Sequence, residues 1–170
     1  MRLAIPPADR ASNSATTPPS SIQVPCRRNC EFCSVRVNTE VWEEENEAAI
    51  QDWMTPDVGA KGLHAEGVAN PDEFAAFHRA LCALVTEIRI TFIKGIETGD
   101  WFAIHGRFDC KSRKTGAPAS FTFHCLSQFE GERFAFAYNG IDFIALFESL
   151  GQIEEGSLEA LMGGGALKRT

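Results

Sequence analysis

The sequence predicts an α+β fold in which helices come first and a sheet follows. Between residues 40 and 86 apolar side chains recur every three or four positions, as on one face of a helix. Between residues 88 and 141 they alternate with polar ones, as in strands that bury one face. The chain has 170 residues, 44% of them apolar and 23% charged, so we expect one globular domain with a buried core.

The N-terminal part of the chain differs from the rest in composition. Residues 1–38 carry a net charge of +3 and residues 39–170 a net charge of −10, and five of the eight prolines lie within residues 1–25. We therefore expect a flexible or loosely attached arm over 1–38 and the folded domain over 39–170.

Composition also indicates which partners and which cellular compartment to expect. The total charge of −7 disfavours nucleic acid as a partner. The chain has no run of 18 apolar residues, so we expect no membrane contact. It also shows no secretory signal pattern, which leads us to expect a cytoplasmic protein with reduced cysteines.

Two helices are expected before the sheet. Residues 40–54 place Trp42, Ile50 and Trp53 on one face, opposite a glutamate-rich face that we expect to be solvated. Residues 57–69 are rich in glycine and are expected to be irregular. The second helix, over 71–86, has an Asn70 cap and a stripe of apolar side chains at Phe74, Phe77, Leu81, Leu84 and Val85.

Four strands in a meander are expected next, over residues 88–97, 101–110, 121–129 and 134–141. Short polar or glycine-containing segments of hairpin length connect them. The side chains expected on the covered face are mainly aromatic: Phe92, Phe102, Phe108, Phe121, Phe123, Phe129, Phe134, Phe136 and Tyr138. A short apolar helix is expected over 143–150, followed by a tail that contains one further short helix.

A cysteine motif lies at the junction between the arm and the domain. Cys26, Cys30 and Cys33 have the C-x3-C-x2-C spacing. This spacing resembles the cluster motif of radical S-adenosylmethionine enzymes, in which three thiolates hold an iron–sulfur cluster. The repeated strand–helix units of those enzymes are missing here, so the iron–sulfur protein is kept as a remote alternative and no metal is expected.

The order of elements and the end of the chain resemble a known family. The segments PDEFAAFHRAL and FEGERFAFAYNGIDFIALFESLG, with the meander between them, are similar to the SnoaL-like group of the nuclear transport factor 2-like superfamily over roughly residues 40–151. The family ending has an aromatic residue, an aspartate and a short helix, which here read Tyr138, Asp142 and Leu150-Gly151. The resemblance implies a cone-shaped barrel, a curved sheet wrapped around helices with a pocket between them. It also implies a homodimer through the outer sheet face.

The same resemblance implies a cofactor-independent isomerase, cyclase or dehydratase acting on a small apolar or aromatic molecule. Asp142 would be its acid/base, with Tyr138 and His64 as polar partners. The pocket wall expected around such a ligand consists of Trp53, Phe102, Phe108, Phe121, Phe123 and Phe136.

Two alternatives remain open. Asp142 precedes an apolar helix and can serve as its N-cap alone. The fold also occurs in domains that bind a ligand or dimerise without catalysing a reaction.

Overall fold

The computed structural model describes residues 30–63 and 65–167. The helices are α1 (Cys30–Val37), the π-helix η1 (Asn38–Glu43), α2 (Ala49–Trp53), α3 (Pro71–Cys82), α4 (Phe143–Ser149) and α5 (Ser157–Met162). The strands are β1 (Met54–Lys61), β2 (Val85–Thr98), β3 (Trp101–Ser112), β4 (Pro118–Glu130) and β5 (Arg133–Ile141). The predicted α+β class and the four-stranded meander are confirmed.

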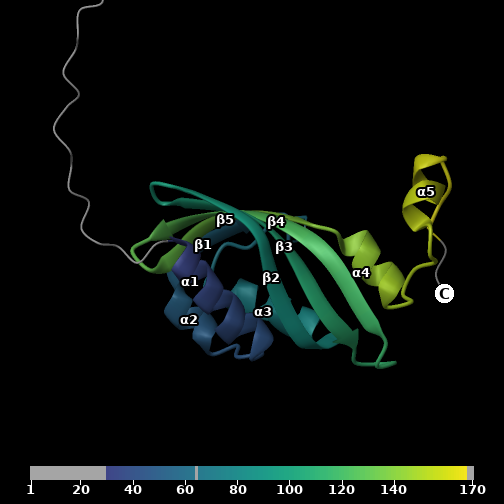
Figure 1. The fold of residues 1–170 in the computed structure, drawn as a ribbon, viewed down its shortest axis with the longest axis horizontal. Coiled ribbons are helices and arrows are strands. Elements are labelled where there is room, and N and C mark those ends of the chain that lie inside the picture. The colour runs from purple at the N-terminus through teal and green to yellow at the C-terminus, as the bar shows by residue number, and fades with distance from the viewer. Residues whose placement is uncertain (1–29, 64, 168–170) are drawn as a thin grey trace, which may run out of the picture.

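The five strands form one curved sheet in the order β1-β5-β4-β3-β2. Strands β2 to β5 pair antiparallel as consecutive hairpins, and β1 lies parallel to β5 at the edge. Figure 1 shows α1, α2 and α3 gathered on one side of this sheet, with α4 next to β4 and α5 farther out. The other face of the sheet is not covered by any helix of the described residues.

Strand β1 was not predicted. The sequence interpretation extended a helix to residue 54 and left residues 57–69 irregular, but the chain is extended from Met54 to Lys61. Pro56 and Gly59 disfavour a central strand, whereas an edge strand tolerates both. Val58 and Ala60 are each 3% exposed, so β1 contributes to the core.

The boundary placed at residue 38 lies within a packed helical segment. Helix α1 continues directly into η1, and Cys33, Val37 and Val41 are at most 4% exposed. For residues 30–38 the expectation of a loosely attached arm is therefore wrong. The rest of that arm lies outside the described residues.

The helix expected over 40–54 is interrupted. A π-helix ends at Glu43, and Glu45 has a φ of 52°, in the left-handed region that a helix does not use. The glutamates around the break are held by arginines from four different elements or turns, in the pairs Arg36–Glu40, Arg79–Glu47, Arg89–Glu43 and Arg113–Glu45. The glutamate-rich segment therefore forms ion pairs with arginines of neighbouring helices and of the sheet, in addition to facing solvent.

A bulge near the start of β5 changes which side chains face the core. Phe129 pairs with Phe134, but the next residue back along β4, Gln128, pairs with Phe136, so Ala135 is the extra residue. An extra residue reverses the inward and outward alternation beyond it. Phe136, Tyr138 and Gly140 therefore point away from the core, and the sequence-based grouping of Phe134, Phe136 and Tyr138 on one face is wrong.

Every helix within the described residues is too short or too polar to cross a lipid bilayer.

Candidate functional site: an apolar cavity between sheet and helices

A cavity of about 110 Å³ lies between the concave face of the sheet and the helices. The helical side contributes Ser34, Val37, Asn38, Trp42, Phe74, Phe77, Leu81 and Phe143. The sheet side contributes Met54, Val58, Gly59, Ala60, Ile90, Ile104, Phe108, Phe121, Phe123, Cys125, Ser127, Phe134, Ala137, Asn139 and Ile141, and Leu63 follows β1. Most of this surface is aliphatic or aromatic.

Helix α3 presents its apolar stripe to the cavity. The predicted Asn70 cap is confirmed, because Asn70 Oδ1 accepts from the Glu73 amide at 2.9 Å. Glu73 Oε2 accepts in turn from the Ala69 amide, one residue before the cap, at 2.8 Å. From this fixed start, the spacing of three and four residues brings Phe74, Phe77 and Leu81 to the same wall.

Trp42 is the central side chain of the helical wall, and η1 positions it. Its indole ring lies edge-on to Phe74, Phe77 and Phe108, with centroid separations of 5.9 to 6.2 Å. Next to it, His78 is 2% exposed, and its Nε2 lies 2.8 Å from the Val41 carbonyl oxygen of the π-helix. The sequence interpretation put Trp42 on a helix face but did not identify it as a pocket residue.

The polar groups of the cavity are few and uncharged. Asn38 and Asn139 each donate through Nδ2 to a backbone carbonyl, at 2.8 and 3.0 Å, and the Cys125 sulfur lies 3.0 Å from the Ser127 hydroxyl oxygen. Burial raises the pKa of the Cys125 thiol to about 11. A thiol with this pKa is protonated at neutral pH, so it serves as a weak polar contact and not as a nucleophile.

Three of the six predicted wall residues line the cavity, namely Phe108, Phe121 and Phe123. Phe102 is 2% exposed but packs in a separate cluster with Cys30, Cys33, Ile104 and Phe129. Phe136 points to the outer face because of the bulge. Trp53 donates its indole N–H to Glu40 at 2.6 Å, outside the cavity lining.

Of the residues expected to be catalytic, Tyr138 and Asp142 do not line this cavity. Tyr138 is 53% exposed and lies opposite Leu126 on the outer face. Asp142 is exposed, and it caps α4, because its Oδ1 accepts from the Ala145 amide at 3.0 Å. The placement of both on the cavity side assumed an unbroken alternation along β5, which the bulge breaks. His64 lies outside the described residues.

The two histidines of the central strands lie on the outer face of the sheet. His105 and His124 occupy paired positions of β3 and β4, and their rings stack at a centroid separation of 4.5 Å. Around them the outer face carries exposed Ile96, Leu126 and Tyr138.

Of the cysteine motif, Cys30 and Cys33 lie in α1 and Cys26 lies outside the described residues. Both described thiols are buried, at 8% and 1% exposure, against Phe102 and Phe129. Burial raises the pKa of Cys30, which favours the neutral thiol over the thiolate that a metal requires. Within the described residues they behave as small core side chains.

A curved sheet closed by helices over an apolar cavity defines a cone-shaped α+β barrel of the nuclear transport factor 2-like type. Residues 35–137 match the model of the SnoaL-like domain, and the chain belongs to this family.

Solved structures agree with the fold. A predicted polyketide cyclase from Acidithiobacillus ferrooxidans superposes with a TM-score of 0.65 at 17% identity, over 78% of this chain and 98% of that one. IdmH, a predicted polyketide cyclase from Streptomyces antibioticus, gives 0.60 at 15% identity, over 72% and 98%. A protein from Catenulispora acidiphila with a ketosteroid isomerase-like fold, solved with trimethylamine, gives 0.60 at 14% identity, over 69% and 91%. No curated protein sequence matches the chain.

Proposed function

We propose that this domain binds one small, largely apolar molecule in the cavity between sheet and helices. The observation that carries the proposal is the lining itself, an aromatic and aliphatic surface with a few fixed polar groups. Ligand pockets have this composition, because apolar walls supply the affinity and sparse polar groups orient the ligand. A volume of about 110 Å³ is close to the roughly 150 Å³ of an engineered cavity that binds benzene.

The lining supports binding over acid–base catalysis. Among the described residues it contains no carboxylate and no imidazole, the groups that transfer protons at neutral pH. The family resemblance implies that Asp142 is the acid/base, but its carboxylate accepts a hydrogen bond from a backbone amide at the start of α4. We therefore place binding first and catalysis through Asp142 second.

Toluene titrated into the protein tests the binding role and whether Asp142 contributes to it. We expect saturable binding of one molecule per chain with a Kd below about 1 mM, followed by calorimetry or by the fluorescence of Trp42. The variant Asp142→Asn should bind toluene equally well and unfold at nearly the same denaturant concentration, because asparagine is also a good N-cap. Absence of saturation in the wild type would contradict the proposal. A marked loss of toluene binding in Asp142→Asn would show that the Asp142 carboxylate contributes to the binding site.

We also propose that the outer face of the sheet pairs with a second copy of the chain. Ile96, Leu126 and Tyr138 are 63%, 40% and 53% exposed and lie in one cross-strand row over β2, β4 and β5. An apolar row at the centre of an uncovered face suits a two-fold interface, in which each copy offers the same surface.

Light scattering tests the dimer. At micromolar concentration we expect a particle of about twice the 18.7 kDa of one chain. Leu126→Arg should give a folded monomer, because two buried arginines would then repel each other across the two-fold axis. A wild-type monomer at high concentration would refute the dimer and leave the cavity proposal untouched.

A further inference from the structure

Two asparagine side chains line the cavity, and their orientation determines whether each amide offers a donor or an acceptor to a ligand. Asn139 lies on β5 of the sheet wall and Asn38 on η1 of the helical wall. Both belong to the cavity lining, and within the described residues that lining contains no Asp, Glu, Lys, Arg or His. Beside the Ser34 and Ser127 hydroxyls and the Cys125 thiol, the polar character of the site therefore depends on which end of each amide faces the cavity.

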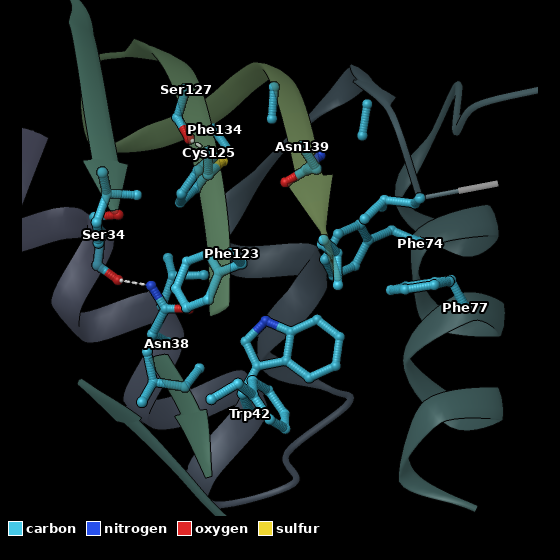
Figure 2. Close-up of a pocket in the computed structure, with 18 of the residues that line it drawn as sticks. Ser34, Asn38, Trp42, Phe74, Phe77, Phe123, Cys125, Ser127, Phe134 and Asn139 are labelled. Carbon is cyan, nitrogen blue, oxygen red and sulfur yellow. Dashed lines mark hydrogen bonds between the residues drawn. The ribbon is translucent and has the colours of Figure 1, made fainter. Parts of the chain in front are cut away.

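The amide of Asn139 is fixed by the end of β1. Its Nδ2 donates to the Lys61 carbonyl oxygen at 3.0 Å, and Lys61 is held against β5 by its pairing with Tyr138. Since a carbonyl oxygen can only accept, the amide cannot be flipped without losing this bond. Figure 2 shows the consequence: the Asn139 oxygen points toward the cavity and its nitrogen points away.

On the opposite wall, a backbone hydrogen bond fixes the orientation of the Asn38 amide in the same way. Its Nδ2 donates to the Ser34 carbonyl oxygen at 2.8 Å, the bond drawn as a dashed line in Figure 2. One of the two N–H groups of the amide is thereby used, and Oδ1 remains as an acceptor. The two walls thus offer carbonyl oxygens.

Carbonyl oxygens in an apolar site select against charge. An anion would face the negative end of each amide dipole and lose its hydration with no cation to compensate. A cation would lose its hydration with no carboxylate in the described lining to compensate, and two neutral carbonyl oxygens replace only part of its hydration shell. A neutral hydroxyl or N–H group can instead donate to the free oxygen, whose bond is strong in apolar surroundings. The volume of about 110 Å³ limits the ligand to about one ring.

We propose that the cavity recognises a neutral, single-ring-sized molecule through a hydroxyl or N–H group that donates to Asn139 Oδ1. This inference rests on the proposed function, because it names the ligand class of the same cavity. Asn139 is on this view a binding residue that sets specificity.

Phenol and toluene are the probes that test it, because they have nearly the same shape and only phenol carries a donor. For the wild type and for Asn139→Leu we would measure the Kd of each by calorimetry at pH 7. We expect Asn139→Leu to weaken phenol about tenfold while toluene binds as well as before or better. Asn139→Ala, which removes the amide oxygen without adding another acceptor, should give the same change and guards against misfolding of the leucine variant.

The outcomes separate this inference from the proposed function. If toluene and phenol both fail to bind the wild type, the proposed function fails. If both bind and the ratio of their Kd values is unchanged in both variants, the cavity binds ligands but Asn139 does not select them. Binding of benzoate or protonated benzylamine more tightly than phenol would also overturn the inference.

Discussion

Replacing Trp42 by alanine is expected to lower the free energy of unfolding by about 3–5 kcal/mol, the range measured for large aromatic side chains removed from protein cores. Trp42 joins three elements, because its ring contacts Phe74 and Phe77 of α3 and Phe108 of β3 from its own position in η1. Removing the indole deletes these aromatic contacts together and enlarges a cavity that the surrounding sheet is too rigid to collapse into.

Chemical denaturation of wild type, Trp42→Ala and Trp42→Phe measures this effect. The phenylalanine variant keeps a ring in the wall, so we expect it to lose less than half as much stability as the alanine variant. Trp53→Ala is a useful comparison, because Trp53 is half-buried and its indole bonds to Glu40 outside the cavity. If Trp42→Ala were no more costly than Trp53→Ala, Trp42 would not be the central side chain of the wall.

The parts of the fold that the sequence predicts are those governed by a single periodicity. The stripe of Phe74, Phe77 and Leu81 is visible in the sequence because one face of α3 is buried and the other is solvated. The alternation that gives Phe102, Ile104 and Phe108 on β3 arises in the same way. In both elements, burial alone determines the pattern.

The parts that it does not predict depend on partners that are distant in the chain. Strand β1 exists because β5 offers it a parallel edge 77 to 80 residues later in the chain, although the sequence of β1 contains a proline and a glycine. The bulge at Ala135 adds one residue to β5 with no local signal. That single residue moves Tyr138 and Phe136 to the outer face and brings Asn139 to the cavity, so the candidate site changes although the strand itself is correct.

Gly106 is the position where the smallest substitution should have the largest effect on ligand binding. It lies on β3 between Ile104 and Phe108, facing the cavity side, and the Phe123 ring covers it. A Cβ added there would lie 2.4 Å from Cζ and 2.6 Å from Cε1 of Phe123, closer than carbon atoms can approach. The ring must therefore move.

In Gly106→Ala, the displaced Phe123 ring has open space to move into only on its cavity side, because Phe123 already forms part of the cavity wall. We expect the ring to take up much of the volume of about 110 Å³ and toluene affinity to fall at least tenfold. The cost in stability should be only about 1–3 kcal/mol, typical of an overpacked core. Calorimetric titration and denaturation of the same sample measure the two effects separately.

The chain supplies a matched control at Gly95 on β2, where an added Cβ would lie 2.6 Å from Cζ of Phe102. The clash is of the same kind, but Phe102 does not line the cavity, so Gly95→Ala should lose comparable stability and keep its affinity for toluene. The double variant Gly106→Ala/Phe123→Leu should recover binding, since the shorter side chain no longer meets the new methyl group. Equal losses of binding in Gly106→Ala and Gly95→Ala, or no recovery in the double variant, would show that general strain in the sheet closes the cavity and not the Phe123 ring.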